Sequence, residues 1–261
     1  MVPAKSTSAV LLFVAAIALA GCGSRAPAAR PEGEAAAQEA GNLTPPQLDS
    51  VRPGPTGITL AGAAPAGAKV RLATPAGQAS FATADALGRW TLVRPPASEA
   101  QIFGLSASEH GRQVQAEGYV LVAPQGQAAL LRAGTGALRI DAPARAGLRA
   151  IDFDRGGGVE VSAQVAPGAT VILRLDGREA AEGRATPAGR FAVSLGSQTP
   201  IRPGAHLIQI SGDGFADQVT AQLSPAAPLA QGPVRSQLNP AGLRVDWMTP
   251  GGGVQSTLLV H

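Results

Sequence analysis

Apolar residues stand at every second position in two stretches of this chain, and the second stretch repeats the first at a fixed distance. The matched pairs, each 101 residues apart, are Ile58 with Val159, Leu60 with Val161, Val70 with Val171 and Leu72 with Leu173. Alternation with a period of two places one face of a strand inward, as in an antiparallel sheet with one solvated face. The chain is therefore predicted to hold one β-module twice.

Turn-forming pairs separate the apolar runs. Asp176-Gly177 and Asp213-Gly214 lie between such runs, and Asp-Gly favours the tight turn of a β-hairpin. No stretch beyond residue 46 has a helical period. Short strands at this spacing predict an all-β fold, here two tandem antiparallel β-sandwiches.

A Gly-Arg-aromatic motif also recurs at the distance of 101 residues. It occurs at Gly88–Trp90 and again at Gly189–Phe191. We interpret each copy as a tight turn that leads the aromatic ring into the core of its module, since such a ring buries about 150–250 Å². The alternative is an aromatic binding residue used twice.

The order of these motifs resembles that of bacterial immunoglobulin-like modules. The second copy resembles them best, through Pro-Gly-Ala-x-Val-x-Leu from Pro167 and Pro-Gly-x-His from Pro203. The first copy has no Pro-Gly where the second of these two motifs would lie. The resemblance implies Ig-like domains at 47–124 and 147–224, with an inter-domain hairpin or linker at 125–146. Modules of this kind recur in tandem on surface and envelope proteins, so the resemblance bears on fold more than on function.

The C-terminal region, 225–261, contains the start of a third repeat. Leu243–Thr257 resembles Leu148–Ser162, including its Gly-Gly-Gly-Val. Because two strands alone are marginally stable, this hairpin should pack on the second module or on residues 127–140. The alternative is an open strand edge that pairs with a partner.

The N-terminus predicts export and lipidation. A basic start and an apolar run precede Leu-Ala-Gly-Cys, which resembles the lipobox of bacterial lipoproteins. The resemblance implies a signal peptide at 1–21 and a lipid on Cys22, the one cysteine of the chain. Residues 22–46 are rich in Ala, Pro, Gly and Glu and predict a disordered linker. Gly23 follows the cysteine in place of Asp, which by the same resemblance favours the periplasmic face of the outer membrane.

No local motif for catalysis, metal binding or a cofactor is found. The chain lacks Gly-x-Ser-x-Gly, and His110, His206 and His261 have no metal-ligand spacing. Asp152 and Asp154 precede a glycine run but lack the other ligands of a calcium loop. An enzyme would need a cleft that gathers Asp152, Asp154, Glu160 or a histidine, so we expect no catalytic residue, no metal and no cofactor.

Charge and aromatic content favour a binding or scaffold role over nucleic-acid binding. The net charge is only +3 and the arginines are scattered. We expect a non-enzymatic envelope lipoprotein, attached to the membrane by its lipid, whose modules present a surface to an envelope protein or to peptidoglycan or another polysaccharide. The alternative is a carbohydrate-binding module that uses exposed aromatic rings, with Trp247 and Tyr119 as the candidates.

Overall fold

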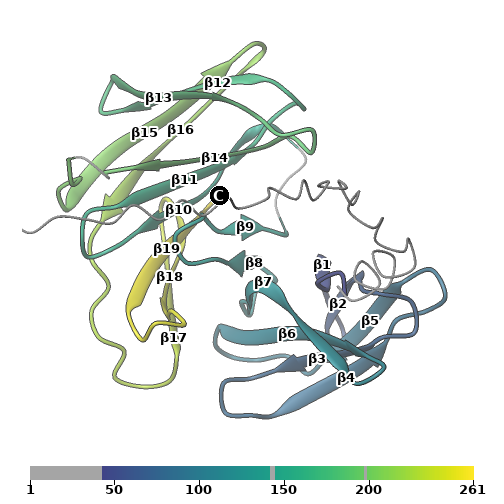
Figure 1. Cartoon of the computed structure of the whole chain (residues 1–261). Helices are drawn as coiled ribbons and strands as arrows, with labels where there is room; N and C mark the ends of the chain where they lie inside the picture. Colours follow the sequence, from purple (N-terminus) through teal and green to yellow (C-terminus); the bar gives the residue numbers. More distant parts are fainter. Residues whose placement is uncertain (1–42, 142–144, 197–198) are drawn as a thin grey trace, which may run out of the picture. The chain divides into compact units, whose positions relative to one another are not determined.

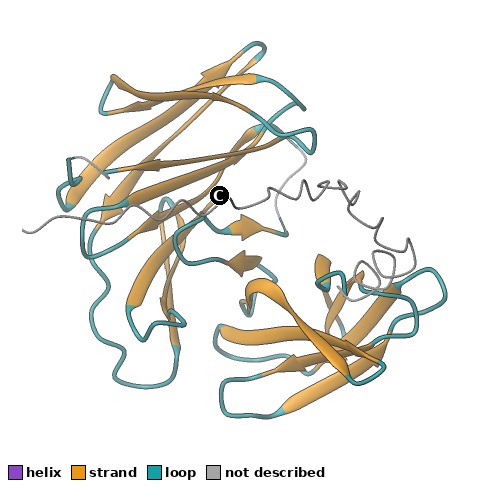
Figure 2. Ribbon diagram, in the orientation of Figure 1, coloured by secondary structure: helices purple, strands orange, loops and turns teal. Residues whose placement is uncertain are grey.

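The structure, a computed structural model, describes residues 43–141, 145–196 and 199–261. All regular secondary structure in these ranges is β-strand (Figure 2), and residues Leu43–His261 form one compact unit. The described part of the chain contains no helix that is both long and apolar enough to cross a membrane. The predicted signal peptide, the predicted lipid site Cys22 and nearly all of the predicted linker lie outside the described residues.

The strands follow one another along the chain as labelled in Figure 1. In the first half they are β1 (Gln47–Gly54), β2 (Gly57–Ala63), β3 (Lys69–Ala73), β4 (Ala79–Thr83), β5 (Arg89–Arg94), β6 (Gln101–Glu109), β7 (Arg112–Val122), β8 (Ala128–Leu131) and β9 (Leu138–Arg139). In the second half they are β10 (Gly147–Phe153), β11 (Val159–Gln164), β12 (Thr170–Leu175), β13 (Arg178–Arg184), β14 (Arg190–Leu195), β15 (Gly204–Gly212), β16 (Phe215–Leu223), β17 (Val234–Asn239), β18 (Gly242–Met248) and β19 (Val254–Val260).

Four antiparallel sheets contain these strands, and the two halves of the chain repeat one arrangement. The sheet β1-β2-β5 corresponds to β10-β11-β14, and β4-β3-β6-β7 corresponds to β13-β12-β15-β16. In each half the two sheets pack face to face. The predicted fold class, tandem antiparallel β-sandwiches, is confirmed, whereas the exact domain limits stay a prediction.

Each half has its own apolar core, built from the alternating residues. The first core includes Leu60, Val70 and Trp90, and the second contains Val161 and Phe191 at matching places. The alternation buries one face of each strand, so these cores follow directly from the period of two.

The repeated Gly-Arg-aromatic motif is a structural corner, as predicted. Gly88 and Gly189 adopt φ of +76° and +73°, a backbone conformation that glycine adopts without strain. A Cβ on Gly88 would lie 2.6 Å from the carbonyl oxygen of Ala64. The rings that follow are inside the protein, since Trp90 is 2% and Phe191 4% exposed.

The C-terminal region forms three strands, one more than predicted. β19 pairs with β10 along Ala150–Phe153 and continues through β18 to β17, so the second half has a six-stranded sheet (Figure 1, yellow strands). Leu258 and Val260 of β19 enter the core of the second module. The prediction that the hairpin packs on the second module or on residues 127–140 is therefore confirmed.

A third apolar core lies on the other face of this six-stranded sheet, against the sheet that contains β6, β7 and β8. Its buried members are Ala100, Ile102, Leu121, Ala123, Ala129, Leu131, Ala137, Ala150, Leu243, Val245, Trp247 and Leu259. In β7, Val120 enters the first core while Leu121 enters the third. In β19, Leu258 enters the second core while Leu259 enters the third. These strands are thus buried on both faces, and the C-terminal strands join the two modules.

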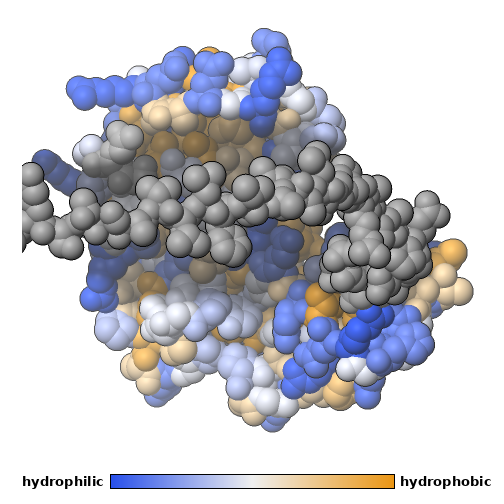
Figure 3. All heavy atoms as spheres, in the orientation of Figure 1, coloured by the Kyte–Doolittle hydropathy of each residue, from blue (hydrophilic) through white to orange (hydrophobic). Residues whose placement is uncertain are grey.

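Exposed large apolar side chains are few in the described residues and come from separate strands and turns. They are Phe81, Leu87, Val93, Leu238 and Met248. On the face seen in Figure 3, apolar areas (orange) are separated by hydrophilic ones (blue). The apolar strand positions are thus used mainly inside the three cores.

Candidate functional site

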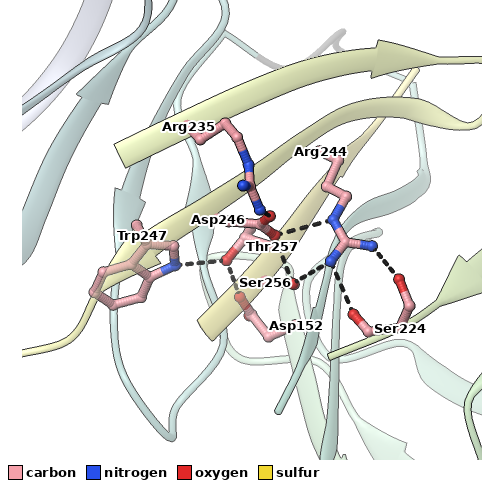
Figure 4. A network of polar contacts seen from close by, with 8 residues as sticks. All are labelled: Asp152, Ser224, Arg235, Arg244, Asp246, Trp247, Ser256 and Thr257. Atoms are coloured by element: carbon pink, nitrogen blue, oxygen red, sulfur yellow. Dashed lines mark hydrogen bonds and ion pairs between the residues drawn. The ribbon is translucent and has the colours of Figure 1, made fainter. Parts of the chain in front are cut away.

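The most elaborate polar cluster among the described residues lies where the C-terminal strands meet β10 (Figure 4). Its centre is Asp152, which is only 2% exposed. The backbone N–H of Ala137, in the β8–β9 connection, donates to Asp152 Oδ2 at 2.8 Å. The Thr257 hydroxyl donates to Asp152 Oδ1 and accepts a hydrogen bond from Trp247 Nε1 at 3.0 Å. One carboxyl group thus contacts the first half of the chain and the C-terminal strands together.

Burial of Asp152 has an electrostatic consequence. Removal from water disfavours the charged carboxylate and raises the pKa of Asp152 to about 6, against the opposing effect of hydrogen bonds from Thr257, the Ala137 N–H and Gln255. Glu160, its cross-strand neighbour on β11, raises the pKa further by charge repulsion. Asp152 therefore titrates close to neutral pH.

A second buried carboxyl group, Asp246 on β18, is surrounded by arginine side chains that favour its charged form. Arg235 Nη2 lies 2.5 Å from Asp246 Oδ2, and Arg244 Nε donates to Oδ1 at 2.9 Å. The Ser256 hydroxyl donates to the same Oδ1 at 2.7 Å. Burial alone would raise the pKa of Asp246, but hydrogen bonds from Ser256, Arg235 and Arg244 outweigh it and hold the pKa below its usual value.

Arg244 extends this second cluster to the segment that follows β16. Its guanidinium donates to the Ser224 hydroxyl at 2.5 Å, to the Ser224 carbonyl at 2.8 Å and to Ser256 Oγ at 2.7 Å. Because Ser256 and Thr257 are adjacent on β19, the Asp246 and Asp152 clusters lie on opposite faces of one sheet. Together they fix the register of the C-terminal strands, since a shift by one residue would bury each charge without its partner.

The structure corrects the role predicted for Trp247. Its side chain is fully buried, and its ring packs edge-to-face on Tyr119 with centroids 6.2 Å apart and planes at 82°. Tyr119 is partly buried against the third core. A sugar ring needs an exposed aromatic face, and Trp247 offers none because β18 is covered by β7 and β8.

The carboxylates named for a possible enzyme do come together. Asp152, Asp154 and Glu160 line one cavity of about 330 Å³. Each is already engaged: Asp152 as described, Asp154 with the Gly158 N–H at 3.0 Å, and Glu160 with Ser194 Oγ at 2.5 Å. Within the described ranges, no three His, Cys, Asp or Glu side chains are placed to hold a metal ion. The carboxylates of this cavity are thus held by hydrogen bonds from within the protein.

The histidines lie apart from this cavity. His206 Nδ1 is 2.8 Å from Asp176 Oδ2, and its Nε2 is 2.8 Å from the Arg202 carbonyl oxygen. His206 thus ties the start of β15 to the β12–β13 turn, as expected for a structural strand residue. His110 is in the β6–β7 turn and His261 follows β19.

Sequence reasoning missed Arg235, Arg244 and Asp246. The available signal was the alternation of charged and apolar residues in Leu243–Trp247, which places Arg244 and Asp246 on one face of a strand. That face is partly buried because the segment after β16 packs on it, where Ser224 accepts hydrogen bonds from Arg244.

Comparison with known proteins gives two similar solved structures. The BSP domain of a biofilm-associated protein is 16% identical, with a TM-score of 0.24, over 71% of this chain and 30% of that chain. A tetra-tandem repeat from the extending region of a large adhesion protein is 16% identical, with a TM-score of 0.25, over 82% of this chain and 61% of that chain. This chain therefore spans less than two thirds of either structure. No family model matches the sequence, and no curated protein matches it.

Proposed function

We propose that this protein is a non-enzymatic, lipid-anchored scaffold of the bacterial cell envelope. A lipid on Cys22 would attach it to the membrane, residues 23–46 would act as a spacer, and the two sandwich modules would present a binding surface to an envelope protein or a cell-wall polymer. Attachment raises the effective concentration of the modules at the membrane, so weak contacts would suffice for binding.

The observation that carries this proposal is the third apolar core. The C-terminal strands are hydrogen-bonded to β10 of the second module and packed on β7 and β8 of the first. Tandem domains that only share a linker move relative to each other. Here Trp247 and Leu259 are buried between the modules, an arrangement suited to presenting a surface in a constant geometry.

The partner is tested by crosslinking the tagged full chain in its own envelope, followed by mass spectrometry of the captured molecules. Repeated capture of one envelope protein or glycan fragment, above the level found with an unrelated tagged lipoprotein, supports the proposal. Capture that matches the unrelated lipoprotein contradicts it.

The anchor is tested separately. Cells grown with a palmitate analogue should label the wild-type chain, and the Cys22→Ser variant should carry no label. Equal labelling of both chains, or release of the wild-type chain from membranes without detergent, would contradict lipidation at Cys22.

A further inference from the structure

The outer strands of the four sheets differ in whether a strand of another sheet lies beside them. In the sandwiches an outer strand lies beside a strand of the neighbouring sheet: β4 beside β5, β13 beside β14, β16 beside β10, β9 beside β10 and β1 beside β7. Among the described residues β17 is the outer strand least covered by strands other than its sheet partner β18, although its Val234 packs against the third core. An uncovered outer strand presents free N–H and C=O groups to other chains.

The hydrogen-bond register shows which groups of β17 face outward. Met248 N–H donates to the Pro233 carbonyl, and the next pairs inward are Val234 with Trp247 and Arg235 with Asp246. Because bonded and non-bonded pairs alternate in an antiparallel ladder, Arg235 bonds β18 whereas Val234 does not. The N–H and C=O groups of Val234, Ser236 and Leu238 therefore point away from the sheet.

A groove of about 490 Å³ runs along this strand. It is lined by Val234, Ser236 and Leu238, by residues 229–231 of the preceding segment, and by Ala100 and Pro124 of the first module. Leu238 is 51% exposed. β17 contains no proline and its pairing with β18 has no bulge, so two of the usual devices that block an edge are absent from it, and Arg235 is its one charged residue.

The first module shows the contrast. Its outer strand β1 has a bulge between Leu48 and Ser50 and carries Pro53. Gly54 and Gly57 flank a two-residue turn and form a bonded pair, so the Pro53 nitrogen faces the outer edge, where it has no hydrogen to donate. The outer strand β1 is thus blocked, whereas neither a proline nor a bulge blocks β17.

We propose that β17 pairs with β17 of a second copy of this chain, antiparallel and about a two-fold axis at Ser236. In that register Val234 faces Leu238 of the other copy, Ser236 faces Ser236, and Arg235 faces Gln237. Apolar residues meet apolar residues, and no like charges are opposed. Val234, Ser236 and Leu238 of one copy each pair with an outward-facing residue of the other copy, and each such pair exchanges two hydrogen bonds. The two six-stranded sheets then become one continuous sheet. This surface of self-association goes beyond the proposed scaffold function and does not depend on it.

A cysteine at the axis tests the register directly. Bonded antiparallel residues have Cα atoms about 5.5 Å apart, within the disulfide range of about 4.4–6.8 Å. The full chain carrying Ser236→Cys, oxidised in the intact envelope, should form a covalent dimer at several times the yield of Thr91→Cys. Thr91 is an exposed residue of β5 and is the matched control. Equal yields from the two variants would overturn the proposal.

A second measurement covers the case in which the cysteine variant does not fold. The purified wild-type full chain in detergent should have the molar mass of a dimer by light scattering, after correction for bound detergent. Ser236→Lys, which opposes two charges at the axis, should have the mass of a monomer, and Thr91→Lys should stay dimeric. A monomeric wild-type chain, or a dimer that Ser236→Lys leaves unchanged, would refute pairing through β17.

Discussion

Replacement of Asp152 by Asn should remove the contribution of this carboxyl group to the pH dependence of stability near neutral pH. The introduced amide is neutral at every pH, while Asp152 in the folded chain ionises at a pKa of about 6 instead of its ordinary 3.8. The pKa is higher in the folded state, so the folded state binds the proton more tightly. The wild-type chain is therefore most stable below pH 3.8 with respect to this group, and it loses that contribution as the pH rises through 6.

The size of the effect follows from the shift. One pKa unit corresponds to about 1.4 kcal/mol, so ionising Asp152 in place costs roughly 3 kcal/mol. Part of this difference develops below pH 5, and roughly 1–2 kcal/mol remains between pH 5 and pH 8. The side-chain amide of the Asp152→Asn variant can still accept from the Ala137 N–H and donate to Thr257 Oγ1, so the substitution itself should cost about 1 kcal/mol or less.

The assay is urea unfolding of wild type and Asp152→Asn at pH 5, 6, 7 and 8, followed by circular dichroism and by Trp fluorescence. The difference in unfolding free energy between variant and wild type should move in favour of the variant by roughly 1–2 kcal/mol from pH 5 to pH 8. The comparison of the two chains cancels titration of groups that they share. A difference that is constant with pH, or that moves in favour of wild type at pH 8, would refute the assignment of a raised pKa to this buried carboxyl.

Three further predictions concern the cores and the second carboxyl. Asp246→Asn should destabilise the chain by about 3 kcal/mol at pH 7, because Arg244 loses a buried partner. The pKa of Asp246 is lowered in the folded state, so this group contributes stability above its unfolded pKa that is lost as the pH falls. The deficit of the variant should therefore shrink towards pH 3, and a deficit that grows in acid would contradict the ion pairs. Trp247→Ala should cost about 3–5 kcal/mol in urea unfolding, and protease cleavage between the modules should become faster; unchanged cleavage would mean that the third core does not join them. Gly88→Ala should lower stability by more than about 1 kcal/mol because of its positive φ and the close Ala64 carbonyl, whereas Gly77→Ala, with positive φ but open space, should cost less; equal losses in thermal unfolding would show that the close contact is unimportant.

The sandwich fold could be predicted because its information is local. Alternation of Ile58 with Leu60, and of Val171 with Leu173, specifies both the strand and its inward face. The glycine two residues before Trp90, and its counterpart two residues before Phe191, each specify a turn that other residues fill only with strain. These features need no knowledge of distant contacts, and they are confirmed.

The polar network could not be predicted in the same way. Trp247 was named as a binding candidate although it shares the apolar face of its strand with Leu243 and Val245. The cover of that face comes from β7 and β8, more than a hundred residues earlier in the chain. Likewise, Asp152 lies among apolar residues in sequence, and its burial depends on Ala137 and Thr257 arriving from two other segments.

The same reasoning explains how the C-terminal hairpin β18–β19 is stabilised. β18 and β19 repeat the hairpin β10–β11, and in a complete module the edge of β11 is covered by β14. The corresponding edge of β19 is covered instead by β10. β10 is the outer strand of its own module, so the edge that does not pair with β11 is available to β19. One face of this hairpin packs on the sheet of the first module that contains β7 and β8. The hairpin thus obtains both an edge partner and a facing sheet from its neighbours. Each neighbour in turn buries apolar residues that it would otherwise expose, such as Leu121 in the first module and Ala150 in the second. The C-terminal strands are consequently part of the stability of both modules, and their removal would uncover an apolar face on each.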